Sequence, residues 1–136
     1  MIQKGQITLF AFPQTDQAIG KLRPALILRS LPGSHDDWLI CMISSQLYHE
    51  IPEFDEIIRD TDSDFLQTGL KQTSLIRVTR LAVVSSNLFE GSIGTLLEER
   101  LNRIYSRLAN WIHNPQDSST SNGKKISEQD TSQESN

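Results

Sequence analysis

Short apolar runs, separated by Gly, Pro, Asn and Asp residues, fill most of the chain before residue 90, and they restrict it to a fold built mainly of short strands. A weaker pattern over 51–58 suggests one further strand, and Ser85-Ser86-Asn87 breaks the series. A succession of this kind predicts a closed or nearly closed β-barrel. The strands are expected over 6–12, 25–30, 38–45 and 74–84, the last range covering one or two strands.

A single helix is expected after the strands, because apolar residues near the end of the chain recur at helical spacing. Thr95 and Glu98 have the spacing of a capping box, which predicts a helix start at about Leu96. We expect its apolar face to cover one side of the barrel, although an interface with a partner helix is the alternative. The apolar positions are Leu97, Leu101, Ile104, Leu108, Trp111 and Ile112.

Pro24 marks the start of the second strand, since proline lacks an amide hydrogen and is tolerated only at a strand's first residue or on an edge. Arg23 is therefore expected directly before the first residue of a buried strand. It either serves as a functional cation or solvates the strand end, as most arginines at such positions do.

Two further strands also carry polar groups at one end or on one face. The strand over 38–45 ends in Ser44, Ser45 and Gln46. In the strand over 74–84, the two-residue period places Leu75, Arg77 and Thr79 on one face. If these groups meet Arg23, they form a site of guanidiniums and hydroxyls suited to phosphate.

The order and spacing of these segments resemble the MazF/PemK family of toxin endoribonucleases, over residues 3–112. The resemblance implies a mainly β fold, a small SH3-like β-barrel with a C-terminal helix. It also implies a homodimer that cuts single-stranded RNA without metal or other cofactor and is neutralised by a cognate antitoxin. The similar segments are Gly5-Gln6-Ile7, Phe12-Pro13-Gln14-Thr15-Asp16, Lys21-Leu22-Arg23-Pro24-Ala25, Ile43-Ser44-Ser45-Gln46 and Ser74-Leu75-Ile76-Arg77-Val78.

The same resemblance assigns roles to individual residues. Arg23 matches the arginine of the family's Arg-Pro strand, Ser44 matches a catalytic hydroxyl that is usually threonine, and Arg77 matches a second catalytic arginine. Thr79 stands where some members have an acidic residue, which removes a candidate general base. The residues expected to contact substrate are Thr15, Asp16, Lys21, Ser45, Gln46 and Thr79.

RNA carries its own nucleophile, the 2′-hydroxyl, so a site without a protein nucleophile can suffice. Its tasks are to orient that hydroxyl, to stabilise charge on the phosphoryl oxygens and to transfer two protons. Arginine suits the second task. For proton transfer the nearest titratable residues in sequence are Asp16, which equally fits a turn, and His49, which we interpret as an exposed loop histidine.

The chain of 136 residues allows one domain, expected over 1–113. Its net charge of −4 argues against broad nucleic-acid binding. Much of the negative charge lies within 50–64, which we interpret as a solvated loop or edge strand away from the arginines. A local cationic groove is compatible with an acidic surface elsewhere on the protein.

The only cysteine, Cys41, lies in an apolar run and is expected to be a buried hydrophobe. With neither a basic segment followed by an apolar run at the N-terminus nor a long apolar stretch, we expect a cytoplasmic protein without a membrane segment. The polar residues 114–136 are expected to form a disordered tail.

Two alternatives to RNA cleavage stay open. A non-cleaving member of the family would bind RNA or an antitoxin-like peptide, and the threonine at position 79 favours this interpretation. A toxin of related fold that targets DNA gyrase would instead depend on helix residues such as Trp111, but a fold does not determine a function.

Overall fold

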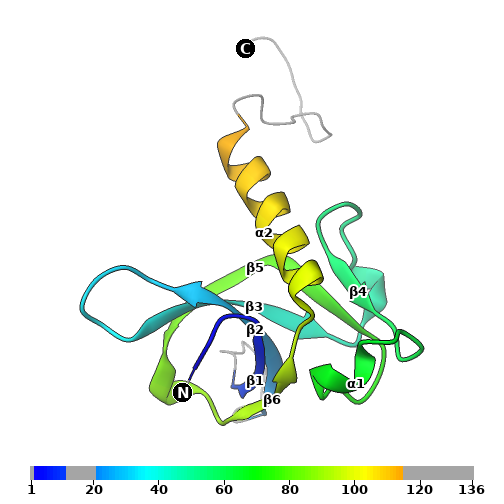
Figure 1. The fold of residues 1–136 in the computed structure, drawn as a ribbon, viewed down its shortest axis with the longest axis horizontal. Coiled ribbons are helices and arrows are strands. Elements are labelled where there is room, and N and C mark those ends of the chain that lie inside the picture. The colour runs from blue at the N-terminus through cyan, green and yellow to red at the C-terminus, as the bar shows by residue number, and fades with distance from the viewer. Residues whose placement is uncertain (1, 12–20, 115–136) are drawn as a thin grey trace.

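The fold is one curled antiparallel sheet with a long helix against one face (Figure 1). The computed structural model describes residues 2–11 and 21–114. In this part of the chain the strand order is β4-β5-β3-β2-β1-β6, so the sheet has edges at β4 and β6. The strands are β1 Gln6–Phe10, β2 Arg23–Ser30, β3 Asp37–Ser44, β4 Glu56–Ile58, β5 Ser74–Ser85 and β6 Ser92–Thr95.

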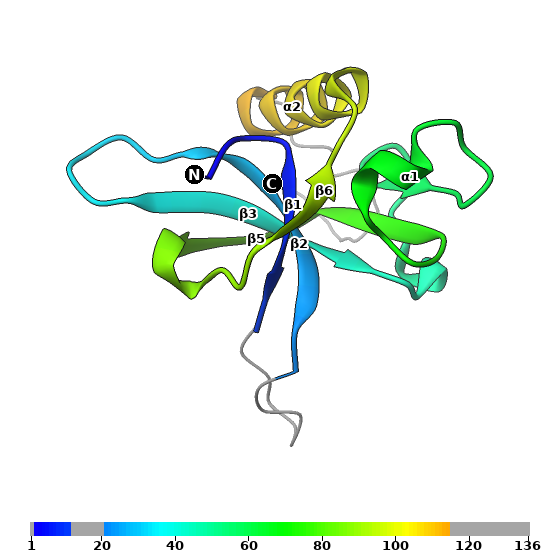
Figure 2. The ribbon, with the colours of Figure 1, turned by 60° about the horizontal axis from the view of Figure 1, so that its bottom comes forward.

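Two helices and two 3₁₀ turns complete the described part. The long helix α2, Glu98–His113, lies across the sheet, and the short helix α1, Phe65–Thr68, lies beside β6 (Figure 2). The turns are η1, Leu47–His49, and η2, Ser86–Leu88. Neither α1 nor α2 has the length and apolar character that a membrane span requires.

The mainly β fold with a C-terminal helix is confirmed, and the differences from the expected elements are local. The range 74–84 is one strand, and only residues 56–58 of the range 51–58 are extended. The predicted capping box is wrong, because Thr95 ends β6 and Leu97 is the N-cap of α2, without a side-chain cap. Some predictions concern residues that the structure does not describe. These are the end of the first predicted strand, the site residues Thr15 and Asp16, and all but the first residue of the predicted tail.

The sheet buries apolar side chains on both faces. On one face, Leu101, Ile104 and Leu108 of α2 join Leu26 and Val78 in the larger cluster. A smaller cluster on the other face contains Phe10, Ala25, Ile27 and Ile40. The expected cover of one side by α2 is therefore confirmed.

A bulge in β2 helps to attach the helix to the sheet. Ile27 pairs with Ile40 and Arg29 pairs with Leu39, so Leu28 is an extra residue in the ladder. The hydroxyl of Tyr105 donates a hydrogen bond to the Leu28 carbonyl. A backbone acceptor at the bulge is thus satisfied by α2, which fixes the helix over β2.

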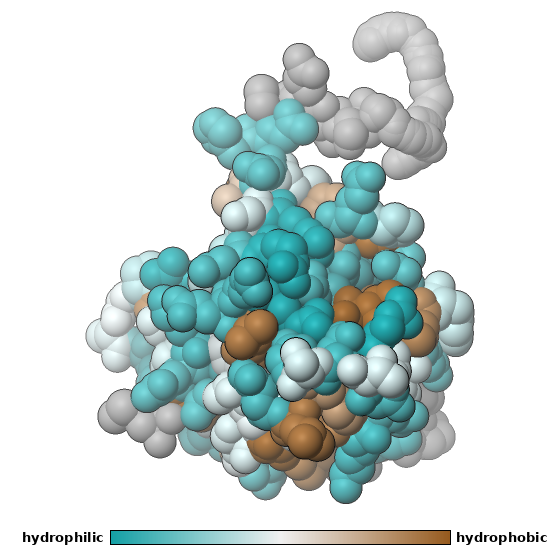
Figure 3. Space-filling view, turned by 45° about the vertical axis from the view of Figure 1, so that its right-hand side comes forward, coloured by the Kyte–Doolittle hydropathy of each residue, from teal (hydrophilic) through white to brown (hydrophobic). Residues whose placement is uncertain are grey.

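The interpretation of 50–64 as a solvated acidic segment is wrong for several of its residues. Glu56 is buried and accepts hydrogen bonds from three arginines of α2, Arg100, Arg103 and Arg107. Arg100 also pairs with Asp64 at 2.6 Å and with Asp62 at 2.8 Å. The acidic residues bind the helix to the segment around β4. Figure 3 shows a face on which hydrophilic residues surround several separate hydrophobic patches.

This network perturbs the carboxyl groups that it contains. Burial acts to raise the pKa of Glu56, but the hydrogen bond from Arg103 and the charges of Arg103 and Arg107 outweigh it and lower the pKa. The hydrogen bond from Arg100 lowers the pKa of Asp64, against the effect of burial. Both carboxylates are therefore stabilised in their charged form.

Cys41 is buried in β3, as expected. Burial raises the pKa of its thiol, and the nearby charge of Asp55 adds to the effect. A thiol held in its neutral form is a poor nucleophile, so Cys41 serves the core.

Candidate active site

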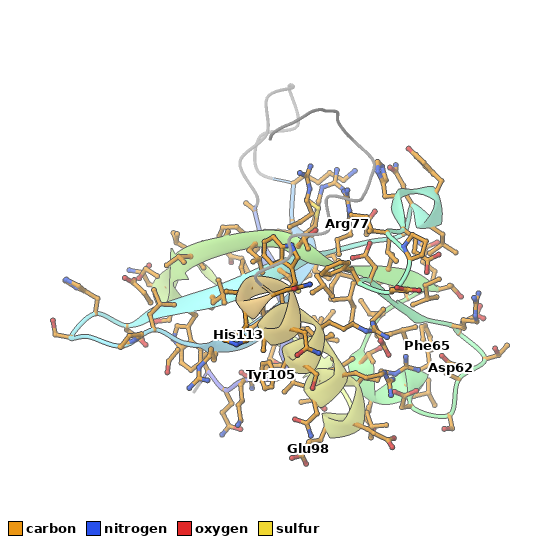
Figure 4. All side chains as sticks on the ribbon, turned by 90° about the horizontal axis from the view of Figure 1, so that it is seen from above. Asp62, Phe65, Arg77, Glu98, Tyr105 and His113 are labelled. Carbon is orange, nitrogen blue, oxygen red and sulfur yellow. The ribbon has the colours of Figure 1, made fainter. Side chains whose placement is uncertain are left out.

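The strand register brings the three residues predicted to be catalytic to one face of the sheet. The strand β3 lies between β2 and β5, and its Met42 pairs with Ala25 on one side and with Arg77 on the other. Cross-strand partners share a face, as do residues two apart. Arg23, Ser44 and Arg77 therefore lie on the face opposite the one that α2 covers. Figure 4 shows Arg77 across the strands from Tyr105 and Glu98 of α2.

These residues line a common pocket, which we call the arginine pocket. Its volume is about 200 Å³. Five of the predicted site residues lie in its wall, and Arg23 and Arg77 are both half-buried there. The lining residues are Arg23, Met42, Ile43, Ser44, Ser45, Gln46, His49 and Arg77.

Charge distinguishes Arg23 and Arg77 from the arginines of α2. In the described part of the chain, neither forms a salt bridge, whereas Arg100, Arg103 and Arg107 all pair with Glu56. No carboxylate lines the arginine pocket among the described residues. Two guanidiniums that form no salt bridge within the described residues favour an anion with several oxygens, such as a phosphodiester.

The Ser44 hydroxyl is held at the end of β3 by the backbone that follows it. The Gln46 N–H donates a hydrogen bond of 3.0 Å to Ser44 Oγ. Because the oxygen accepts this bond, its proton is directed elsewhere, where it can be donated to a bound oxyanion. Ser44 is thus positioned to interact with a substrate as a hydrogen-bond donor.

A wide bulge in β5 lies directly beside Arg77. Met42 pairs with Arg77 but its neighbour Cys41 pairs with Leu81, so the residues 78–80 have no partner on β3. The Asp55 carboxylate provides an acceptor for the bulge, because the Val78 N–H donates a hydrogen bond of 3.0 Å to it. The Ile51 N–H donates a second hydrogen bond, of 2.8 Å, to the same carboxylate. Bulges commonly redirect a side chain at a functional site.

Asp55 was missed by the sequence reasoning, which treated it as part of the solvated acidic segment. It is 6% exposed and links the segment before β4 to the bulge. The apolar residues Phe54, Ile57 and Ile58 around it indicate burial, but its distant partner Val78 cannot be found from one sequence.

The interpretation of His49 as an exposed loop histidine is wrong, because it is half-buried in η1 and lines the arginine pocket. Its Nε2 is 3.1 Å from Gln46 Oε1, which the Tyr48 hydroxyl also contacts at 3.0 Å. The rings of Tyr48 and His49 lie 4.3 Å apart. The turn η1 folds this histidine back toward the end of β3, and its spacing of three residues from Gln46 is the feature that could have indicated this.

The remaining predicted site residues have different positions. Thr79 lies in the β5 bulge and is half-buried, and Lys21 is exposed before β2; neither lines the arginine pocket. Thr15 and Asp16 lie outside the described residues. Within residues 2–11 and 21–114, no three His, Cys, Asp or Glu side chains are grouped as metal ligands.

Comparison with known proteins gives one family and a shared fold. Residues 3–112 match the family model described as PemK-like, MazF-like toxin of type II toxin-antitoxin system. A mycobacterial endoribonuclease solved with its cognate antitoxin is 13% identical, with 85% of this chain and 98% of that chain covered and a TM-score of 0.58. The Mycobacterium tuberculosis toxin MazF-mt6 is 16% identical, with 77% of this chain and 93% of that chain covered and a TM-score of 0.56. Curated protein sequences gave no match.

Proposed function

The chain belongs to the PemK-like, MazF-like toxins of type II toxin-antitoxin systems, and we propose that it is an endoribonuclease that cuts single-stranded RNA without a metal ion. The observation that carries the proposal is the arginine pocket, where Arg23 and Arg77 meet Ser44 without a carboxylate partner in the described residues. The similar fold of a mycobacterial endoribonuclease adds support.

The reaction uses the 2′-hydroxyl of the RNA as its nucleophile. Its oxygen attacks the adjacent phosphorus, the bond from phosphorus to the 5′-oxygen breaks, and the products are a 2′,3′-cyclic phosphate and a 5′-hydroxyl. Arg23 and Arg77 bind the phosphoryl oxygens, whose charge grows in the transition state, and the Ser44 hydroxyl donates to the same group. Stabilisation by one such donor is worth about 3–4 kcal/mol.

Two protons must also move, one from the 2′-hydroxyl and one to the leaving oxygen. Among the described residues that line the arginine pocket, His49 is the one histidine, and none is a carboxylic acid. Histidine is the side chain most often used for general acid and base catalysis. We assign it one of the two transfers, and Asp16 stays a candidate for the other.

The partners of the proposed enzyme follow from its family and from the charge of the pocket. A cognate antitoxin would silence it, and an acidic or extended peptide placed across Arg23 and Arg77 would compensate the two guanidiniums. The family also leads us to propose a homodimer that acts in the cytoplasm.

The proposal is tested by incubating the purified protein with a long single-stranded RNA in EDTA and determining the ends of the fragments. We expect discrete cuts that leave cyclic phosphates, and no cut where the nucleotide 5′ of the scissile phosphate carries 2′-deoxyribose. Intact RNA from a folded protein would overturn the proposal and favour a non-cleaving member. Cleavage that requires a divalent metal would overturn the mechanism.

A further inference from the structure

A second, larger pocket adjoins the arginine pocket at the ends of β2 and β3, and we call it the apolar pocket. Its volume is about 430 Å³, and it shares Arg23, Ile43, Ser44 and Ser45 with the arginine pocket. Volumes of about 300–1,000 Å³ are usual for small-molecule sites. The two pockets are therefore neighbours at the strand ends, with Arg23 and Ser44 between them.

The register shows how the two pockets are arranged. Pro24 follows Arg23 and pairs with Leu9, and Ile43 precedes Ser44, so Leu9, Pro24 and Ile43 lie on the opposite face from the catalytic side chains. A ligand that wraps around the strand ends would thus place one part against Arg23 and Ser44 and another part against these apolar side chains.

The far wall of the apolar pocket combines apolar and polar groups. Leu70 and Ile93 contribute apolar surface, and the exposed side chains of Lys71 and Gln72 line the same wall. Lys71 has three donors, and the Gln72 amide has two donors and an acceptor. An apolar slot with adaptable hydrogen-bonding groups at its margin suits a flat heteroaromatic ring with polar edges.

This wall is held against the sheet by two close approaches of glycine. A Cβ at Gly69 would lie 2.0 Å from the Ile93 carbonyl oxygen, and one at Gly94 would lie 2.4 Å from the backbone of Thr68. Such contacts leave no room for a side chain, so α1 and the residues after it pack directly on β6. The backbone that leads into Lys71 and Gln72 is therefore packed directly on β6.

We propose that the apolar pocket binds a nucleobase of the RNA next to the scissile phosphate, and that Lys71 and Gln72 help to select that base. The inference rests on the proposed ribonuclease function. A nucleotide joins an anionic phosphate to a flat base with polar edges, and the neighbouring pockets provide a cationic part and an apolar part in the same order. Single-stranded RNA is read through such splayed bases.

The first test compares cleavage sites on a long RNA of varied sequence for the wild type, Lys71→Ala, Gln72→Ala and Lys4→Ala, with sequencing of the fragment ends. Lys4 is exposed before β1, at the end of that strand distant from Phe10, the partner of Arg23, so its variant is the control for lost charge. We expect Lys71→Ala and Gln72→Ala to relax the preference at one position beside the cut. Lys4→Ala should keep the wild-type preference.

The second test uses the preferred sequence with one base at a time replaced by an abasic ribonucleotide. Loss of the bound base should slow wild-type cleavage by about tenfold or more. Lys71→Ala and Gln72→Ala should show a smaller penalty at that position and the wild-type penalty at all others.

The outcomes separate this inference from the proposed function. A wild type that cleaves nothing overturns both. If the wild type cleaves RNA and the Lys71 and Gln72 variants keep its sequence preference, the base pocket alone is overturned and the ribonuclease function stands. The same holds if these variants cleave every site at a uniformly lower rate. Equal loss of preference in Lys4→Ala would show a general effect of charge and would also overturn it.

Discussion

At the scale of residues, the use of each arginine depends on whether the fold supplies it with a carboxylate. Arg100 is surrounded by Glu56, Asp62 and Asp64, and this raises its pKa, mainly through the hydrogen bond to Asp64. Arg23 and Arg77 have no such partner in the described part of the chain. Their charges are therefore available for a substrate.

The Ser44 hydroxyl should matter for the rate and little for the fold, because its bond from the Gln46 N–H lies at an exposed strand end. We expect Ser44→Ala to slow RNA cleavage by about a hundredfold or more, the usual scale for one transition-state donor. Ser44→Thr keeps a hydroxyl and should keep most of the rate. Single-turnover kinetics measure both, and an alanine variant as fast as the threonine variant would remove Ser44 from the mechanism.

Asp55 should matter for stability, because its carboxylate accepts hydrogen bonds from two backbone N–H groups, that of Val78 in the β5 bulge and that of Ile51 before β4. Asp55→Ala leaves both donors without this partner, which we expect to lower the free energy of unfolding by about 2–4 kcal/mol. Urea denaturation measures the loss. Glu53→Ala is the control, since Glu53 is exposed in the same segment; a similar small effect in both variants would contradict the assigned role.

At the scale of elements, α2 is held by an apolar stripe and by ion pairs, and its two ends differ. Leu101, Ile104 and Leu108 are buried, whereas Trp111 is 50% exposed and contacts Phe54 edge to face. The helical spacing in the sequence predicted these three positions, but it also placed Leu97, Trp111 and Ile112 on the buried stripe, and all three are exposed. Arg103 and Arg107 lie beside this stripe and bind Glu56.

Because of this ion network, the free energy of unfolding should fall as the pH becomes acidic. The folded protein lowers the pKa of Glu56 and of Asp64, so their contribution is full above the ordinary carboxyl range, near pH 4, and is lost as the pH falls through the lowered pKa values. We expect the double variant Glu56→Gln, Asp64→Asn to lose less stability between neutral and acidic pH than the wild type. Glu98→Gln, at an exposed position, should keep the wild-type slope.

Denaturation curves at several pH values give the comparison. The slope of unfolding free energy against pH is the relevant quantity, because it is independent of any constant loss in the double variant. An unchanged slope in the double variant would show that other carboxylates cause the acid sensitivity.

The contact between α1 and β6 predicts a second effect at this scale. In Gly94→Ala the new methyl group would lie 2.4 Å from the backbone of Thr68, so α1 must move. We expect a loss of about 1–3 kcal/mol, the usual cost of overpacking, measured by thermal or urea unfolding. Ser92→Ala in the same strand should be nearly neutral, and equal stability of the two variants would contradict the close packing.

At the scale of the whole molecule, the sequence predicted local patterns well and distant pairings poorly. The strands containing Arg23, Ser44 and Arg77 were recognised because apolar runs and Pro24 mark them locally. The burial of Glu56 depends on partners 44–51 residues away, which no local pattern shows. The strand β6, with only four residues and a central glycine, is defined by its packing and was not predicted.

The site follows the same division. The convergence of Arg23 and Arg77 on one face depends on β3 lying between β2 and β5, which is a property of strand order. The family resemblance supplied that expectation. The apolar pocket, by contrast, depends on how the wall after α1 meets the strand ends, and nothing in the sequence pattern alone indicates it.

The central claim is that Arg23 and Arg77 of the arginine pocket stabilise the transition state of RNA cleavage, and one pair of variants tests it most directly. Arg23→Ala and Arg80→Ala remove the same group, but Arg80 is exposed in the β5 bulge and does not line the arginine pocket. In single-turnover cleavage of one RNA in EDTA, we expect Arg23→Ala to be slower by about a hundred- to a thousandfold. Arg80→Ala should cleave at nearly the wild-type rate. A folded Arg23→Ala protein that cleaves like the wild type, or equal losses in both variants, would contradict the claim.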